Sequence, residues 1–66
     1  MNSFFKYLDF LKVYYEMNMS LSKTADKLFL HKNTVQQRLK KILGQSGYDP
    51  RSFQDAVLLY LACRLE

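Results

Sequence analysis

The chain has 66 residues, 48% of them hydrophobic, and a formal net charge of +4. This length predicts one small domain and leaves no room for a catalytic domain beside it. One Cys and one His exclude an intramolecular disulfide and a four-ligand zinc site, so we expect no metal or other cofactor. The longest apolar run, Ala56–Cys63, is too short to span a bilayer, and the N-terminus lacks the order of a signal peptide. These features predict a cytoplasmic protein with no membrane partner.

The first segment predicts a helix from about residue 3 to residue 17, with Ser3 as its N-cap. Helical periodicity gathers one apolar face for the core, with Tyr7 and Tyr14 on its flank. That face consists of Phe4, Leu8, Leu11 and Tyr15. A second apolar strip, formed by Phe10, Val13 and Met17, lies on the opposite side of the same helix.

Residues 20–43 form a helix-turn-helix pattern within a single domain that we expect to span residues 1–66. Ser20 is the predicted N-cap of a helix over about residues 21–28, and a short turn leads to a second helix over about 32–43. Ala25 supplies the small residue needed where the two helices cross. Leu28 and Leu30 are expected to bury the turn, and Val35, Leu39 and Ile42 to face inward. Phe29 occupies the turn position that glycine most often fills, which implies either a turn without positive φ or a turn anchored by the packed ring.

The excess positive charge coincides with this pattern. Between Lys27 and Tyr48 the chain has five basic residues and no acidic one, whereas the other 44 residues carry five basic and six acidic groups. A basic second helix in such a pair is typical of proteins that bind duplex DNA. The predicted contacts to base edges come from Asn33, Thr34, Gln36 and Gln37, since Asn and Gln pair bidentately with adenine. The predicted phosphate contacts come from Ser22, Thr24, Lys27, His31, Lys32, Arg38, Lys40 and Lys41.

Three of these assignments keep an alternative. Arg38 projects sideways, where it serves either a phosphate or an intramolecular carboxylate such as Asp26. His31 either contacts a phosphate or has a local capping or packing role beside the second helix. The basic face as a whole has a plainer interpretation too, because a charged helix face is often only a solvated one.

Glycines and a proline interrupt the helical pattern after residue 43. Residues 44–47 are predicted to end the second helix of the pair, and Asp49-Pro50 to open the next element as N-cap and first helical residue. The last helix, over about residues 52–64, is apolar nearly all round. The whole pattern predicts an all-α bundle of four or five short helices. No acid/base pair or nucleophile–His arrangement occurs at a recognisable spacing, so we expect no enzyme activity.

Five motifs follow one another along the chain: Leu8…Leu11…Tyr14-Tyr15-Glu16, Leu21-Ser22-x-Thr24-Ala25, Leu28-Phe29-Leu30-His31-Lys32-Asn33-Thr34-Val35, Arg38-Leu39-x-x-Ile42 and Ser46-Gly47-Tyr48-Asp49. Their order resembles the C-terminal helix-turn-helix DNA-binding domain of PucR-type transcriptional regulators of purine catabolism and sugar-diacid utilisation, and is more distantly similar to Fis-like proteins. The resemblance implies a five-helix domain that binds operator DNA, normally behind an N-terminal sensory region, which we expect to lie outside these 66 residues. It also accounts for Phe29 in the turn. Gln36 and Gln37 replace the family's usual Arg and aromatic residue, which implies a different sequence preference.

The second apolar strip of the first helix and the apolar surface of the last helix leave two interpretations open. Either the first and last helices bury it against each other and the helix-turn-helix, or it forms a homodimer interface or a docking surface for a sensory domain. The surface in question comprises Phe10, Val13, Met17, Leu58, Leu59 and Ala62. The sequence therefore predicts a bacterial transcription regulator that binds double-stranded DNA. The alternative is a helical protein-interaction or dimerisation module that does not touch DNA.

Overall fold

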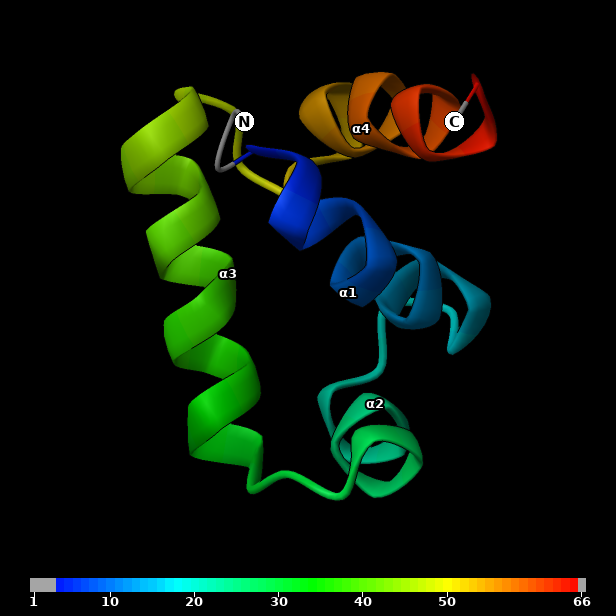
Figure 1. The fold of residues 1–66 in the computed structure, drawn as a ribbon, viewed down its shortest axis with the longest axis vertical. Helices are drawn as coiled ribbons and strands as arrows, with labels where there is room; N and C mark the ends of the chain where they lie inside the picture. The colour runs from blue at the N-terminus through cyan, green and yellow to red at the C-terminus, as the bar shows by residue number, and fades with distance from the viewer. Residues whose placement is uncertain (1–3, 66) are drawn as a thin grey trace.

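The computed structural model describes residues 4–65, with side chains from Lys6 onward. Its helices are α1 (Phe4–Glu16), α2 (Leu21–Leu28), α3 (Lys32–Ser46) and α4 (Phe53–Leu65). Figure 1 shows α1 in the middle, α3 along one side of it, and α4 and α2 at opposite ends of the long axis. This architecture confirms the all-α prediction, with four helices in the described residues. The predicted N-cap Ser3 and the side chain of Phe4 lie outside those residues.

The helix α1 lies at the centre of the packing and contacts each of the other three helices. Its buried side chains are Leu8, Phe10, Leu11 and Tyr14. Phe10 is 6% exposed and belongs to the core, which agrees with the first interpretation of the second apolar strip, burial between packed helices, and removes Phe10 from the alternative dimer or docking surface. The reason is that neighbours pack on two sides of α1, so its second apolar strip is covered as well as the first. Tyr15, predicted to face the core, is half-buried at the margin, and Val13 and Met17 are also half-buried.

The remaining core residues come from all the other helices. They are Ala25 of α2, Val35, Leu39 and Ile42 of α3, and Leu59 and Cys63 of α4. Val35, Leu39 and Ile42 have no exposed surface, as their spacing along α3 predicted. The thiol of Cys63 donates to the carbonyl of Leu8 at 3.7 Å, which joins α4 to α1.

The helix α2 begins as the sequence indicated. The Ser20 hydroxyl accepts a hydrogen bond of 3.1 Å from the backbone N–H of Lys23, so it satisfies a donor that the first turn of a helix leaves without a partner. Asn18 and Met19 precede it with φ values of 57° and 62°. This left-handed pair reverses the chain between α1 and α2.

The helix α3 ends one turn later than predicted. Gly44 lies inside the helix, and the chain leaves it at Gly47, whose φ of 80° is left-handed and whose N–H donates to the Leu43 carbonyl at 2.8 Å. Ser46 strengthens this end, because its hydroxyl donates to the Ile42 carbonyl at 2.6 Å and accepts from the N–H of Tyr48 at 3.1 Å.

The helix α4 begins at Phe53, within one residue of the predicted start at about residue 52, and the predicted Asp49-Pro50 start belongs to a separate turn before it. The Asp49 carboxylate accepts from the N–H of Arg51 at 3.0 Å and so caps a separate turn that precedes Phe53. Asp55 ties this turn to α4 by accepting from the N–H of Asp49 at 2.9 Å. Pro50 is buried beneath the turn.

The surface predicted for dimerisation or docking also changes. Leu59 is 3% exposed and Ala62 packs against the core, because this side of α4 faces α1. Only Leu58 of the three α4 residues predicted for this surface is exposed. Within residues 4–65 no helix is long and apolar enough to cross a membrane, and no group of three or more side chains is placed to hold a metal ion.

Candidate nucleic-acid interface

The turn between α2 and α3 sets the angle between these helices. The N–H of Leu30 donates to the Ala25 carbonyl at 2.9 Å, and the N–H of Phe29 to the Asp26 carbonyl at 3.4 Å. This pair of bonds forms a Schellman-type helix end, in which the residue after the helix adopts the left-handed conformation. Phe29 does so with φ 58° and ψ 43°. The turn therefore has the geometry of the usual glycine turn.

Both alternatives predicted for Phe29 were wrong. Its φ is positive, and its ring is 94% exposed instead of packed. The neighbouring residues anchor the turn, since Leu28 and Leu30 pack against the core cluster as predicted. The sequence did not predict that the Phe29 ring projects into solvent. The only signal for it in the sequence is an aromatic residue at a turn position that glycine usually fills.

The outward face of α3 presents amides and cations. Between Lys32 and Lys41 every exposed side chain is of these two kinds: Lys32, Asn33, Gln36, Gln37, Arg38, Lys40 and Lys41. Thr34, also predicted to contact bases, is half-buried. The buried residues Val35, Leu39 and Ile42 hold the opposite side of the helix in the core, so the exposed face has a fixed orientation.

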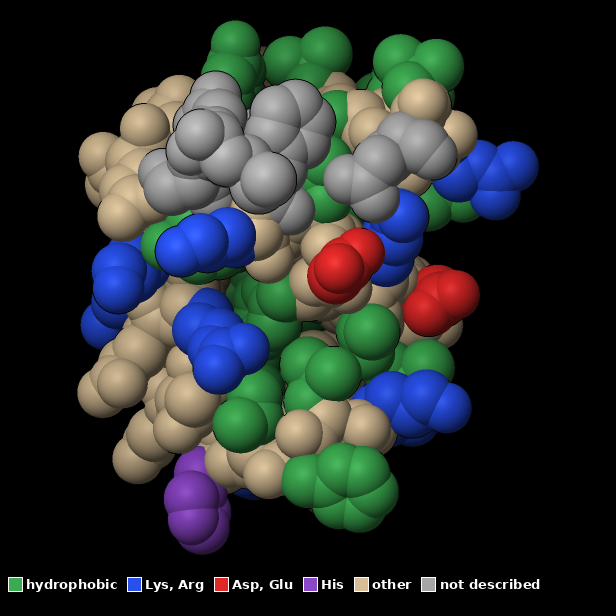
Figure 2. All heavy atoms as spheres, in the orientation of Figure 1, with side chains coloured by type: hydrophobic (Ala, Val, Ile, Leu, Met, Phe, Trp, Pro, Cys, Tyr) green, Lys and Arg blue, Asp and Glu red, His purple; other side chains and the backbone are tan. Residues whose placement is uncertain are grey.

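The electrostatic character of this surface is positive. The helix α3 contains no acidic residue, and Lys27 at the end of α2 is exposed as well. Figure 2 shows Lys and Arg side chains over the part of the molecule that α3 occupies, with His31 at the end where the α2–α3 turn lies. The acidic side chains visible in that view lie away from α3. We call the exposed residues Lys32, Asn33, Gln36, Gln37, Lys40 and Lys41 the α3 polar face.

Arg38 has a partner that the sequence did not indicate. Its guanidinium carbon lies 5.7 Å from the centre of the Phe10 ring, within the range of a cation–π contact. The contact places Arg38 between α1 and α3, where its guanidinium lies over a core aromatic ring. Neither predicted role, phosphate or Asp26, included this contact.

Two predicted phosphate ligands in α2 differ sharply in access. Ser22 is exposed in the first turn. Thr24 has no exposed surface, and its Oγ1 has no hydrogen-bond partner among the described residues. The prediction of a phosphate contact from the Thr24 side chain is therefore corrected, because the hydroxyl is buried and cannot reach a DNA backbone.

His31 is the N-cap residue of α3, with an extended backbone at φ −79° and ψ 151°. Its carbonyl accepts from the N–H groups of Thr34 at 3.0 Å and Val35 at 3.2 Å, while its exposed side chain makes no capping hydrogen bond. The capping alternative for the imidazole is thus not used. The start of α3 therefore presents three exposed polar side chains, the imidazole of His31, the ammonium of Lys32 and the amide of Asn33.

Comparison with known proteins places this geometry in context. The family model of the PucR C-terminal helix-turn-helix domain matches residues 7–65 of the chain. The carbohydrate diacid regulator of Escherichia coli is 36% identical over 56 residues, which are 85% of this chain and 14% of that protein. The purine catabolism regulatory protein of Bacillus subtilis is 41% identical over 59 residues, which are 85% of this chain and 10% of that protein.

An uncharacterized protein of Bacillus subtilis is 40% identical over 53 residues, which are 80% of this chain and 18% of that protein. The chain thus spans less than a fifth of the length of these three relatives. No solved structure matches it.

Proposed function

Because the chain belongs to the family of PucR C-terminal helix-turn-helix domains, which are DNA-binding domains of transcription regulators, we propose that it binds double-stranded DNA with α3 in the major groove. The observation that supports this most directly is the α3 polar face, where every exposed side chain from Lys32 to Lys41 is an amide or a cation. A major groove lined by base edges and flanked by phosphates matches both kinds of side chain.

Base readout is assigned to the first half of α3. Asn33, Gln36 and Gln37 are exposed there, and a Gln or Asn amide pairs bidentately with the N6 and N7 atoms of adenine. The structure supports this assignment because Val35 and Leu39 are fully buried, which fixes the rotation of α3 about its own axis. An operator for this chain should therefore contain adenines at defined positions.

Phosphate contacts are assigned to the cations at the two ends of the polar face. Lys32 lies at the start of α3, and Lys40 and Lys41 lie two turns later, so the three can reach the backbone on both sides of one groove. A single copy neutralises only a few phosphates in this way. Its affinity should be micromolar or weaker at physiological salt.

The role in regulation follows from the family. The two named relatives are, by their names, regulators of carbohydrate diacid and purine catabolism. For this chain we infer the DNA-binding step of transcription regulation, with the effector sensed by a separate region. The resemblance implies an Arg and an aromatic residue where this chain has Gln36 and Gln37, so we infer an operator preference of its own.

The first experiment is selection of bound duplexes from a randomised pool, followed by anisotropy titrations at 50 and 200 mM salt with the selected sequence. Gln37→Ala should relax the preference at one base pair, at a cost of about 1–3 kcal/mol against the selected sequence. Tyr48→Ala, at an exposed site outside α3, is the matched control and should change neither sequence nor affinity.

The outcome that contradicts the proposal is equally clear. If no sequence is enriched, and the affinity of Gln37→Ala matches that of the wild type on every duplex, then α3 does not read bases. If no duplex binds at 50 mM salt, the alternative of a protein-interaction module takes its place.

A further inference from the structure

The outer side of α4 is an apolar surface without a partner helix. Of the exposed residues between Phe53 and Leu65, only Gln54 and Arg64 are not apolar. The exposed apolar side chains are Phe53, Val57, Leu58, Tyr60, Leu61 and Leu65, with exposed fractions from 43% to 87%. We call these six residues the outer face of α4. A helix that is apolar on its outer side as well as its inner side is normally covered on both.

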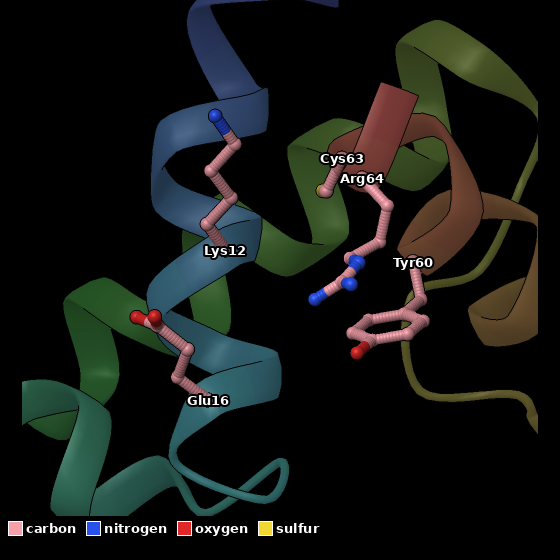
Figure 3. Close-up of a pocket in the computed structure, with 5 residues that line it drawn as sticks. All are labelled: Lys12, Glu16, Tyr60, Cys63 and Arg64. Carbon is pink, nitrogen blue, oxygen red and sulfur yellow. The ribbon is translucent and has the colours of Figure 1, made fainter. Parts of the chain in front are cut away.

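A hollow beside this face extends it onto α1. It has a volume of about 300 Å³ and is lined by Tyr15, Met19, Phe53, Val57 and Tyr60. On the other side of Tyr60 lies a second hollow of about 330 Å³, drawn in Figure 3. Lys12 and Glu16 of α1 and Arg64 of α4 line it, and the Arg64 guanidinium lies 6.0 Å from the Tyr60 ring centre. These charges mark the polar border of the outer face.

The size of the outer face suits a small protein interface. Large exposed side chains present about 150–250 Å² each, so the six exposed fractions amount to roughly 600 Å². That lies at the upper end of the range for the largest apolar patch of an ordinary monomer, about 300–600 Å². It is somewhat less than the ~800 Å² per partner of a standard interface. A partner of about the same size and apolar character would give a weak, reversible complex.

The arrangement of the outer face is self-complementary. Val57 and Leu61 lie at equal distances from the middle of α4, and so do Phe53 and Leu65. In an antiparallel pair of α4 helices related by a two-fold axis, each of these residues meets its counterpart in the other copy. The spacing of Val57, Leu58, Leu61 and Leu65 is that of a helix–helix seam.

The distribution of charge also favours pairing of two copies through α4. Each copy carries +4, so two copies repel where their basic surfaces meet. None of the six residues of the outer face is charged, and α4 lies at the opposite end of the long axis from the α2–α3 turn (Figure 1). Contact through α4 therefore keeps the cations near that turn apart.

We propose that the outer face of α4 is the docking surface for a second copy of this chain, joined in an antiparallel α4–α4 pair. This proposal goes beyond DNA binding and does not depend on it. The outer face of α4 and the α3 polar face share no residue, so the pair uses a different surface from the one proposed to bind DNA. The self-association itself is a property of the free protein.

Sedimentation velocity without DNA tests the proposal, from about 10 µM to 1 mM chain because an interface of this size binds weakly. The wild type should shift from monomer to dimer across this range. Leu61→Lys places a cation near the two-fold axis and should raise the dimer dissociation constant at least tenfold. Tyr48→Lys makes the same charge change at an exposed aromatic residue outside α4 and should leave the constant within about twofold.

Leu58→Lys is a second variant on the same face, and it keeps the test valid if Leu61→Lys does not fold. Circular dichroism checks the helix content of both variants. A wild type that stays monomeric to 1 mM overturns the proposal and leaves the face to a different protein. Association that survives both leucine variants, or that Tyr48→Lys weakens equally, overturns it too. DNA binding is measured separately, so failure of one proposal is distinct from failure of the other.

Discussion

The hydroxyl of Tyr15 in α1 donates a hydrogen bond of 3.0 Å to the carbonyl of Pro50, in the turn that precedes α4. Burial, and after it the neighbouring Tyr14, raises the pKa of the Tyr15 phenol above its ordinary value of 10.0. The unfolded chain then binds fewer protons than the folded chain above pH 10, so the free energy of unfolding falls as pH rises through that range. We expect Tyr15→Phe to make this fall shallower.

Urea denaturation at a series of pH values from 7 to 11.5 measures this effect. At pH 7 the same substitution should cost about 1 kcal/mol, because the Pro50 carbonyl loses its donor. Tyr48→Phe removes an exposed phenol and serves as the control. An unchanged alkaline slope in Tyr15→Phe would contradict the assignment.

Thr24→Val should stabilise the fold. The hydroxyl is fully buried and has no hydrogen-bond partner among the described residues, while valine has nearly the same shape. Removing an unsatisfied polar group should raise the free energy of unfolding by about 1 kcal/mol. Thermal denaturation measures the change, and Ser22→Ala, at an exposed site, should move it by less than about 0.5 kcal/mol.

The same Thr24 variant separates the two roles considered for this residue. Because the side chain has no exposed surface, Thr24→Val should bind DNA as tightly as the wild type. A loss of affinity without a loss of stability would restore the phosphate contact that the structure argues against.

Phe29→Gly should also stabilise the chain, since φ of 58° strains any residue with a Cβ. Relief of that strain outweighs the greater freedom of glycine in the unfolded chain, and a gain of about 0.5–1 kcal/mol is expected. Phe29→Ala removes the exposed ring but keeps the strain, so its stability should match the wild type. If the Ala and Gly variants have the same free energy of unfolding in chemical denaturation, the exposed ring and not backbone strain determines the stability effect at this position.

The salt dependence of DNA binding distinguishes phosphate ligands from other cations. Replacing Lys40 and Lys41 with Gln should reduce the slope of log affinity against log salt by about 0.9 for each phosphate that the variant no longer neutralises. Arg64→Gln removes one positive charge on α4, away from the polar face, and should leave the slope unchanged. If the slope falls in the Arg64 variant and not in the Lys40/Lys41 variant, the DNA binds near α4 and the proposed contact with the α3 polar face is contradicted.

Periodicity and cap chemistry predicted much of this fold. The Ser20 cap, the bounds of α2 and the burial of Val35, Leu39 and Ile42 depend on local spacing, which one sequence contains. The outward direction of Gln36 and Gln37 follows from the same spacing.

Other features depend on contacts between segments, which local spacing does not contain. Phe10 is buried because Arg38 and α3 cover the second side of α1. Gly44 stays helical because the Ser46 hydroxyl and Gly47 complete the helix end one turn later. Phe29 is left-handed because the backbone bonds of Leu30 and the packing of its flanks outweigh the steric preference of one residue.

The central position of α1 has a consequence for how the molecule opens. Among the described residues α4 contacts α1 but has no comparably close contact with α2 or α3, whereas α1 contacts all three. Detachment of α4 therefore breaks one interface and leaves the other three helices together. We expect the amide hydrogens of α4 to exchange with solvent through this partial opening, while those in the middle of α1 and α3 exchange only on complete unfolding.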